Sequence, residues 1–230
     1  MHIHCISRID TSAFHGVNGY GHGDYGRECL DSIIAKLMGA ESALVRLQLF
    51  SGTHAISTAL FGCLRPGDNM LCVSGHPYDT LEEVIGQRPG HQTGNLRGSL
   101  KDWGIGYSEL ELLYKEEAKQ ANNDIVAFDI PSIDEAIEKD ASIKLIHIQR
   151  SCGYQWRPSI PISEISRLCS HLKQKYAHRD DLVIFVDNCY GELVEEQEPC
   201  HVGADIIAGS LIKNLGGTLA PCGGYIAGRK

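Results

Sequence analysis

Two apolar runs without alternation, IKLIHIQ at 143–149 and LVIFVDN at 182–188, constrain the fold of this chain more than any other feature. Strands that are apolar on both sides are buried on both faces, as in a parallel sheet covered by helices. The segment between them, 162–176, is predicted as a helix. This strand–helix–strand order predicts an α/β fold: a mostly parallel sheet with helices on both faces.

The same alternation extends along the rest of the chain. Further strands are predicted at 43–50, 69–75, 204–210 and 223–228. Helices are predicted at 53–64 and from residue 28 onward, the latter ending at Gly39. Short helices should begin at two capping-box patterns, and a long polar loop should cover 86–104; the pattern pairs are Thr80 with Glu83 and Ser132 with Glu135.

Composition excludes several classes of partner. A net charge of −8 and a pI near 5.7 argue against nucleic acid and anionic membranes. No apolar run approaches the roughly 18 residues of a membrane span, and the first residues do not resemble a signal peptide. Nine cysteines without a CxxC pair suit reduced thiols in a cytoplasmic protein, and their spacing argues against zinc. We therefore expect no metal site.

Several polar motifs fall where predicted strands end: FSGTHA, SGHPYDT, IQRSCGY, VDNCYGE and GSLIKN. In a parallel sheet these ends share one edge, and ligands of open α/β sheets bind there. We therefore expect the functional site at this edge.

The motif SGTHA at 51–55 leads from a strand into a helix. A turn of small residues at a helix start presents backbone N–H groups and the positive end of the helix dipole, which suits a phosphate. Neither a P-loop nor a GxGxxG turn is present. The alternative is that Ser51 or Thr53 only caps the helix.

Asp187 and Lys213 each follow an apolar run, and Ser210 stands three residues before the lysine. A carboxylate, an amine and a phosphate site at one edge are what pyridoxal phosphate requires, because the lysine forms a Schiff base and the carboxylate holds the ring nitrogen. The alternatives are a surface carboxylate or helix cap and a solvated lysine.

Many stretches resemble fold-type I pyridoxal phosphate enzymes, specifically the methionine gamma-lyase and cystathionine beta-lyase-like group known as aluminium resistance proteins. They run in the family's order from about residue 7 to residue 228. The stretches are GYGHGDYGRECL, LVRLQLFSGTHAI, LRPGD, HPYDTLEEVIG, GSLKDWGI, IQRSCGYQWRPS, VDNCYGELVEEQEP, GADIIAGSLIKNLGG and GGYIAG.

The resemblance implies a role for each residue at the expected edge. Lys213 would carry the cofactor, and Tyr78 would stack on its ring as the second catalytic residue. Asp187 would pair with the ring nitrogen. Gly52 and Thr53 would bind the phosphate with Ser210 beside them.

The resemblance also implies contacts beyond this core of the site. Gln149 and Arg150 would approach the cofactor hydroxyl or the substrate carboxylate. Tyr20, Tyr25 and Arg27 lie where related lyases reach into a neighbouring subunit's phosphate site, and which of the three does so stays open. A homodimer or homotetramer is therefore expected for the full-length form.

Three histidines lie near these motifs. His147 alternates with Ile146 and Ile148 in a strand, which favours a core position, and His54 could shape the phosphate turn. For these two and for His76 we expect structural rather than catalytic roles.

As a whole, 1–230 is expected to be the cofactor-binding large domain, of the aminotransferase-like kind. Compared with the family, its N-terminal segment looks partial and the smaller C-terminal domain is missing. The implied activity is β- or γ-elimination on a sulfur-containing amino acid. The alternative is a truncated domain that keeps the fold or cofactor binding without catalysis.

Overall fold

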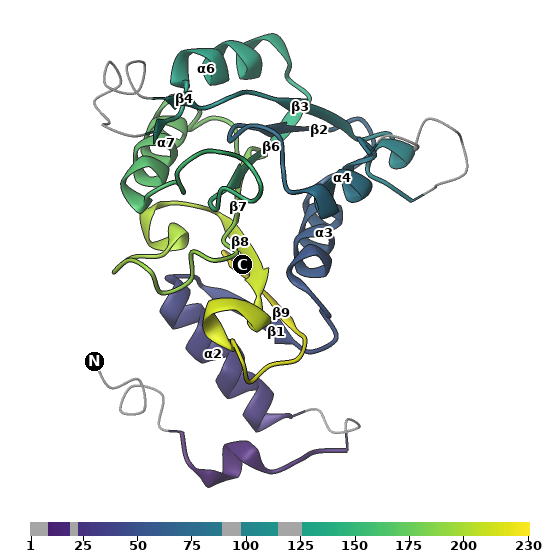
Figure 1. Ribbon diagram of the computed structural model, residues 1–230, viewed down its shortest axis with the longest axis vertical. Coiled ribbons are helices and arrows are strands. Elements are labelled where there is room, and N and C mark those ends of the chain that lie inside the picture. The colour runs from purple at the N-terminus through teal and green to yellow at the C-terminus, as the bar shows by residue number, and fades with distance from the viewer. Residues whose placement is uncertain (1–8, 19–22, 89–97, 115–125) are drawn as a thin grey trace.

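The computed structural model describes residues 9–18, 23–88, 98–114 and 126–230, and its centre is a seven-stranded sheet (Figure 1). A separate two-stranded sheet pairs β4 (Leu113–Tyr114) with β5 (Val126–Ala127). In spatial order the strands of the main sheet are β1 (Ser42–Arg46), β9 (Gly224–Gly228), β8 (Ile206–Ser210), β7 (Val183–Asp187), β6 (Ile143–Gln149), β2 (Asn69–Cys72) and β3 (Gly106–Glu109).

The sheet is mostly parallel, as the sequence predicts. Neighbouring strands from β8 through β7, β6 and β2 to β3 all run in one direction. Within the described residues, β9 is the one strand of this sheet that runs the other way, antiparallel to both β1 and β8. The carboxyl ends of β1, β2, β6, β7 and β8 therefore share one edge, where Gln149 lies opposite Asp187.

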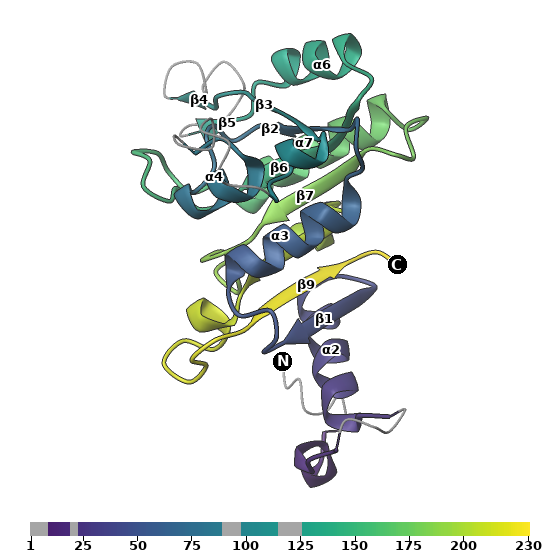
Figure 2. The same ribbon diagram turned by 90° about the vertical axis from the view of Figure 1, so that its right-hand side faces the viewer.

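Helices cover both faces of the sheet, which confirms the predicted fold class (Figure 2). Leu145 and Phe185 point to the side of α3 (Gly52–Cys63) and α4 (Asp79–Ile85). Their neighbours Ile146 and Ile184 point to the opposite side. That side is covered by α2 (Tyr25–Met38), α6 (Ile130–Lys139) and α7 (Ile162–Lys175).

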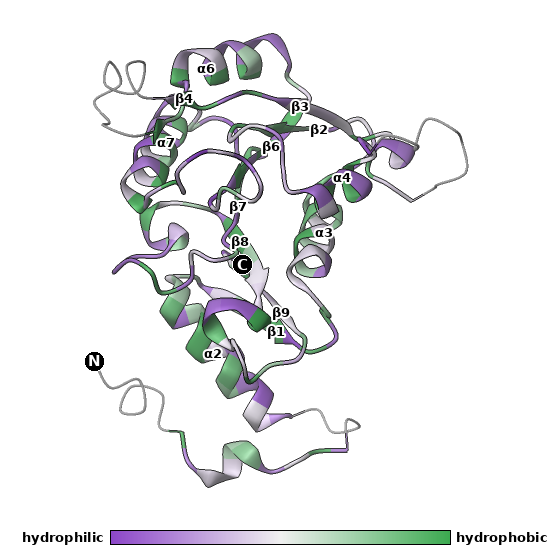
Figure 3. Ribbon diagram, viewed as in Figure 1, coloured by the Kyte–Doolittle hydropathy of each residue, from purple (hydrophilic) through white to green (hydrophobic). Residues whose placement is uncertain are grey.

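The hydropathy of the chain follows this layering (Figure 3). The outer helices carry an apolar and a polar side, whereas residues of β6 and β7 are buried on both faces. The unalternating runs of the sequence are thus the central strands, buried between two helical layers.

The ends of the helices confirm one of the predicted stop and start signals and contradict two others. α2 ends at Gly39 as predicted, in the left-handed conformation (φ 68°). Both capping-box predictions are wrong. Tyr78 precedes α4, so Thr80 lies within the helix and bonds to Thr53 instead. The side chain of Asp129 caps α6 by accepting from the N–H of Ser132.

Short elements complete the chain. The strands β3, β4 and β5 were not predicted, because β4 and β5 have only two residues each and β3, GYSE, contains no apolar run. Part of the predicted loop 86–104 lies outside the described residues, and its end forms the turn η3 (Lys101–Trp103). Other short turns are η1 (Thr11–Phe14) and η4 (Pro199–Val202). No helix in the described ranges is both long and apolar enough to cross a bilayer.

Candidate functional site

A cavity of about 200 Å³ lies at the carboxyl edge of the sheet, where the sequence places the site. Its walls come from the start of α3, the segment before α4, the ends of β7 and β8 and the turn after β6. Six of the predicted site residues line it together: Gly52, Thr53, Tyr78, Asp187, Ser210 and Lys213.

The start of α3 forms one end of this cavity. The Ser51 side chain caps the helix by accepting from the N–H of His54 at 3.1 Å. Since the first N–H groups of a helix have no partner within it, those of Gly52 and Thr53 are suited to an anion. A Cβ at Gly52 would lie 2.9 Å from the Cys189 sulfur and 3.2 Å from the Ser210 Cβ. Only glycine fits this approach.

Asp187 ends β7 as a buried carboxylate facing the cavity. It accepts a hydrogen bond from the N–H of Cys189 at 3.0 Å. Burial raises its pKa even though the bonds from Cys189 and the charge of Lys213 act in the opposite direction. Among the described residues no cation forms an ion pair with it. Such a carboxylate calls for a cationic or hydrogen-bond-donating ligand group.

Lys213 lies in η5 (Leu211–Leu215), directly after β8. Its backbone leaves helical geometry (φ −99°, ψ −129°). Its Nζ stands 3.9 Å from the centre of the Tyr190 ring. The glycines that follow let the segment fold onto itself, because a Cβ at Gly217 would lie 2.7 Å from the Lys213 carbonyl oxygen.

Tyr78 is held at the cavity by the end of β6. Its backbone N–H donates to Gln149 Oε1 at 2.6 Å. Its ring stacks on that of Tyr154 with centroids 5.2 Å apart, and its hydroxyl donates to the Tyr154 hydroxyl at 3.3 Å. This hydrogen bond is the main cause that raises the pKa of Tyr78 to about 12, and burial adds to it. Tyr78 therefore stays protonated at neutral pH.

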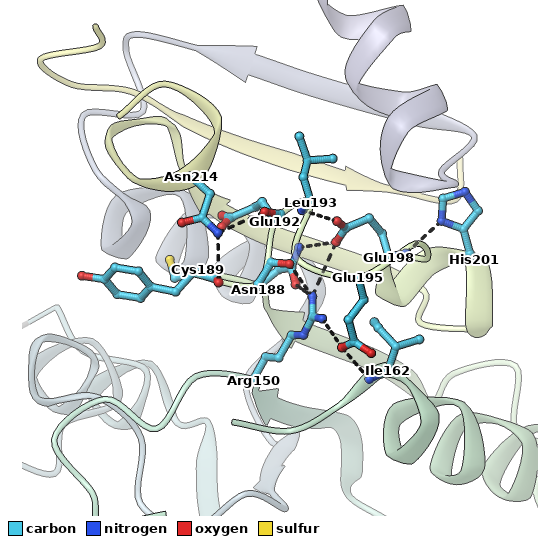
Figure 4. Close-up of polar contacts among 12 residues, drawn as sticks. Arg150, Ile162, Asn188, Cys189, Glu192, Leu193, Glu195, Glu198, His201 and Asn214 are labelled. Carbon is cyan, nitrogen blue, oxygen red and sulfur yellow. Dashed lines mark hydrogen bonds and ion pairs between the residues drawn. The ribbon is translucent and has the colours of Figure 1, made fainter. Parts of the chain in front are cut away.

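Gln149 and Arg150 do not line this cavity, although both were expected near it. The Gln149 amide also donates to the carbonyl of Ser151 at 3.1 Å. The buried Arg150 guanidinium donates to Asn188 Oδ1 at 2.9 Å, and to Gly191 O and Glu195 Oε1 at 2.7 Å each (Figure 4). These side chains bond within the chain and shape the walls of the cavity.

The segment after β7, residues 188–198, is fixed by further side chains (Figure 4). We call it the 188–198 loop. Glu198 accepts from the Asn188 amide at 2.9 Å and from the Leu193 N–H at 2.6 Å. The Asn214 amide donates to the carbonyls of Tyr190 and Glu192, both at 3.0 Å. The residue next to Lys213 is thus bonded to the loop that follows Asp187.

The residues expected to reach a neighbouring subunit lie elsewhere. Tyr25 and Arg27 are in the first turn of α2, where Tyr25 is exposed and Arg27 pairs with Asp24 at 3.3 Å. Neither lines the cavity of its own chain. Tyr20 lies outside the described residues.

The histidines take structural positions. His147 is fully buried, stacks on Phe185 and lies 3.3 Å from the Cys72 sulfur. Burial lowers its pKa to about 4, so it is neutral. His54 Nδ1 accepts from the Phe50 N–H at 3.3 Å. His76 lies between Glu109 and Glu82, at 3.0 and 3.1 Å.

A second hollow, of about 260 Å³, lies away from the carboxyl ends, near the start of β7. Three of its charged groups pair with each other, because Lys173 and Arg229 both contact Asp205, at 3.2 and 3.1 Å. Its size exceeds that of the first cavity, but it gathers none of the residues at the strand ends. The first cavity is therefore the one where the predicted site residues meet.

Sequence reasoning missed several residues of the cavity. Cys189 and Tyr190 follow Asp187 by two and three positions, and Thr80 follows Tyr78 by two. Their nearness in the sequence to the predicted residues is a signal that could have pointed to them. Tyr154, which stacks on Tyr78, lies four residues after Arg150 at the end of the motif IQRSCGY, so the same signal applies to it.

The chain matches the family model of methionine gamma-lyase over residues 2–230. It is 49% identical over 222 residues to the uncharacterised protein YnbB of Bacillus subtilis, covering 96% of this chain and 48% of that one. The chain therefore spans about half the length of this relative.

Solved structures of similar proteins also match this chain over about half of their own length. A candidate cystathionine beta-lyase involved in aluminium resistance from Listeria monocytogenes has 47% identity and a TM-score of 0.85, over 99% of this chain and 51% of that one. A carbon–sulfur lyase involved in aluminium resistance from Clostridium novyi has 44% identity and a TM-score of 0.84, over 99% and 50%. These likenesses cover nearly all of the chain described above.

The ion pairs of His76 lead to a testable pH dependence. Burial of the imidazole opposes its charge, but the bonds to Glu109 and Glu82 outweigh burial and raise its pKa above the usual 6.5. A raised folded-state pKa stabilises the protein fully below about pH 6.5, and this contribution is lost as pH rises through the raised value. We expect His76→Gln to cost a few tenths to about 1 kcal/mol at pH 5.5, and less at pH 9.

Urea unfolding of both proteins across this pH range measures the difference. His54→Gln is the comparison variant, because no carboxylate pairs with His54 among the described residues, so this variant loses no histidine–carboxylate pair. A constant difference for His76→Gln would show that the two carboxylates do not hold a charged imidazole.

Proposed function

The chain belongs to the methionine gamma-lyase family, and on that premise we propose that it is a pyridoxal phosphate-dependent carbon–sulfur lyase acting on a sulfur-containing amino acid. The name of the Clostridium novyi relative supports this reaction class. The observation that carries the proposal is the meeting of Lys213, Asp187 and the start of α3 at one cavity. The reaction would be β- or γ-elimination.

The residues of the cavity fit this cofactor. Lys213 would bind it covalently through Nζ, and Asp187 would face the ring nitrogen. Gly52 and Thr53 would bind the phosphate with their N–H groups, with the Ser210 hydroxyl beside them. When bound, pyridoxal phosphate supplies an electron sink that stabilises a carbanion of the amino acid.

The fit rests on Asp187 in particular. A buried carboxylate without an ion-pair partner among the described residues is costly to keep charged. A protonated ring nitrogen would balance this charge and would itself be kept protonated by it. The glycine at position 52 lets the start of α3 lie close to Cys189 and Ser210, so the first N–H groups of the helix and the Ser210 side chain meet at the same cavity.

Two side chains are available to handle protons. The hydroxyl of Tyr78, with a pKa of about 12, is a poor base at neutral pH, and its ring is placed for stacking. The Lys213 amine, on the neighbouring wall, is then the group that would take and return a proton at Nζ. In this proposal the ring of Tyr78 orients the cofactor, and the amine of Lys213 transfers the proton.

The first prediction concerns Lys213. Pyridoxal phosphate added to the protein should produce a visible absorption band, and borohydride reduction with peptide mapping should find the cofactor on Lys213. Lys213→Ala should lose the band and all turnover, whereas Lys139→Ala, an exposed lysine paired with Glu135, should keep both. Label on another lysine, or none, would contradict the proposal.

The same experiment separates the proposed enzyme from a domain that binds without catalysis. Label on Lys213 together with release of a thiol or ammonia from cystathionine, methionine or cysteine derivatives supports the lyase. Label without release from any of them supports the alternative.

Asp187→Asn gives the second prediction. The substitution keeps the shape of the side chain but removes the negative charge from the cavity. We expect a retained fold, weaker cofactor binding and elimination slowed roughly 100-fold, which corresponds to about 2.7 kcal/mol. Asp181→Asn, at an exposed ion pair with Arg179 outside the cavity, should leave the rate unchanged. An unchanged rate in Asp187→Asn would make Asp187 structural.

We also propose that the protein acts as a homodimer or homotetramer. Tyr25 and Arg27 cannot serve the cavity of their own chain, and large apolar side chains near the sheet edge, including Leu47 and Phe50, are exposed. Light scattering should give a dimeric or tetrameric mass. Mixing inactive Lys213→Ala with impaired Arg27→Ala should restore part of the activity, because mixed dimers contain one intact site. A strict monomer would exclude the proposal.

A further inference from the structure

The 188–198 loop carries backbone strain next to the candidate site. Tyr190 (φ 68°) and Leu193 (φ 60°) have left-handed backbone conformations that residues other than glycine rarely adopt. Such strained conformations persist only where surrounding contacts enforce them. Here the enforcing contacts come from Arg150, Glu198 and Asn214.

The strained conformation places one aromatic ring at the cavity wall. Tyr190 lines the cavity, and its ring lies beneath the Lys213 amine, 3.9 Å from Nζ to the ring centre. A cation over the face of an aromatic ring is attracted by the negative charge of that face. Among the described residues no carboxylate forms an ion pair with Lys213, although its charge acts on Asp187, so the Tyr190 ring is the contact that the structure gives for the amine.

The lysine and the ring are also joined through the backbone. Asn214, next to Lys213, donates to the carbonyl of Tyr190 itself and to that of Glu192. The end of η5 and the turn of the loop therefore form one hydrogen-bonded unit (Figure 4). The contact between Nζ and the ring follows from this geometry and does not depend on the Tyr190 hydroxyl.

We propose that the ring of Tyr190 is a docking position for the amine of Lys213, which holds this long side chain in the cavity when it carries no ligand. Tyr190 is then a positioning residue that acts through Lys213. This inference rests on the proposed function for its meaning, because a held amine is useful where that amine must meet a cofactor. An amine that is already held by the ring reduces the entropy cost of ordering the lysine side chain when the cofactor binds.

The contact can be measured without cofactor or turnover. Reductive methylation with ¹³C-formaldehyde places dimethyl groups on the lysine amines and keeps their charge. In the NMR spectrum of the 230-residue chain, the Lys213 methyl signal should be shifted upfield of the other lysines by the ring current. Lys213→Arg identifies the signal by its loss.

Variants at Tyr190 separate the ring from the fold. Tyr190→Phe keeps the ring, so the upfield shift should remain. Tyr190→Asn removes the ring, and asparagine adopts the left-handed conformation more readily than most residues, so the loop should keep its backbone. The shift should then be lost. Tyr154→Asn, which removes the ring opposite Tyr78, is the matched control and should leave the Lys213 signal unchanged.

Two results would overturn the inference. One is a Lys213 signal at the position of the other lysines in the unmutated chain. The other is an upfield signal that persists in Tyr190→Asn. Because neither involves pyridoxal phosphate, failure here leaves the proposed function standing. Equally, the expected shifts together with cofactor on another lysine would refute the proposed function and keep the contact.

Discussion

The shape of the site depends on the hydrogen bonds of the Arg150 guanidinium. It is buried at the end of β6 and joins that strand to Asn188, Gly191 and Glu195 of the 188–198 loop, with Glu198 3.7 Å away. A buried charge is tolerated only when it is paired and hydrogen-bonded, so removing one partner of such a group typically costs about 3–5 kcal/mol. The strained loop that presents Tyr190 is therefore anchored in the interior of the protein rather than at its surface.

The layered fold could be predicted because the signal is strong and local. Residues such as Ile146 and Ile184 belong to apolar runs that only a doubly covered strand explains. The edge of the sheet then places Asp187, Ser210 and Lys213 together, since strands that run parallel end on one side. The roles assigned to these residues came from chemistry and from resemblance, and their meeting in one cavity agrees with that assignment.

What could not be predicted depends on contacts between distant segments. Arg150 was expected at a ligand, but its partners lie some 40 residues later in a loop that no pattern describes. Thr80 looked like a helix cap, yet the chain enters α4 one residue before it and turns its hydroxyl toward Thr53. For both side chains the local sequence allows more than one hydrogen-bond partner, and contacts with distant segments determine which partner is bound.

The end of β6 shapes two walls of the cavity through adjacent residues. Side chains alternate along a strand, so Gln149 and Arg150 face different neighbours. Gln149 accepts from the backbone of Tyr78, and Arg150 fixes the turn that carries Tyr190. Two aromatic rings at the cavity are thus positioned from one point of the sheet, while Asp187 ends the neighbouring strand. The sheet determines where the polar groups of the site meet, and the side chains of Gln149 and Arg150 determine which aromatic rings surround them. Differences in substrate among relatives that share the sheet are then expected to arise in the loops held by such side chains.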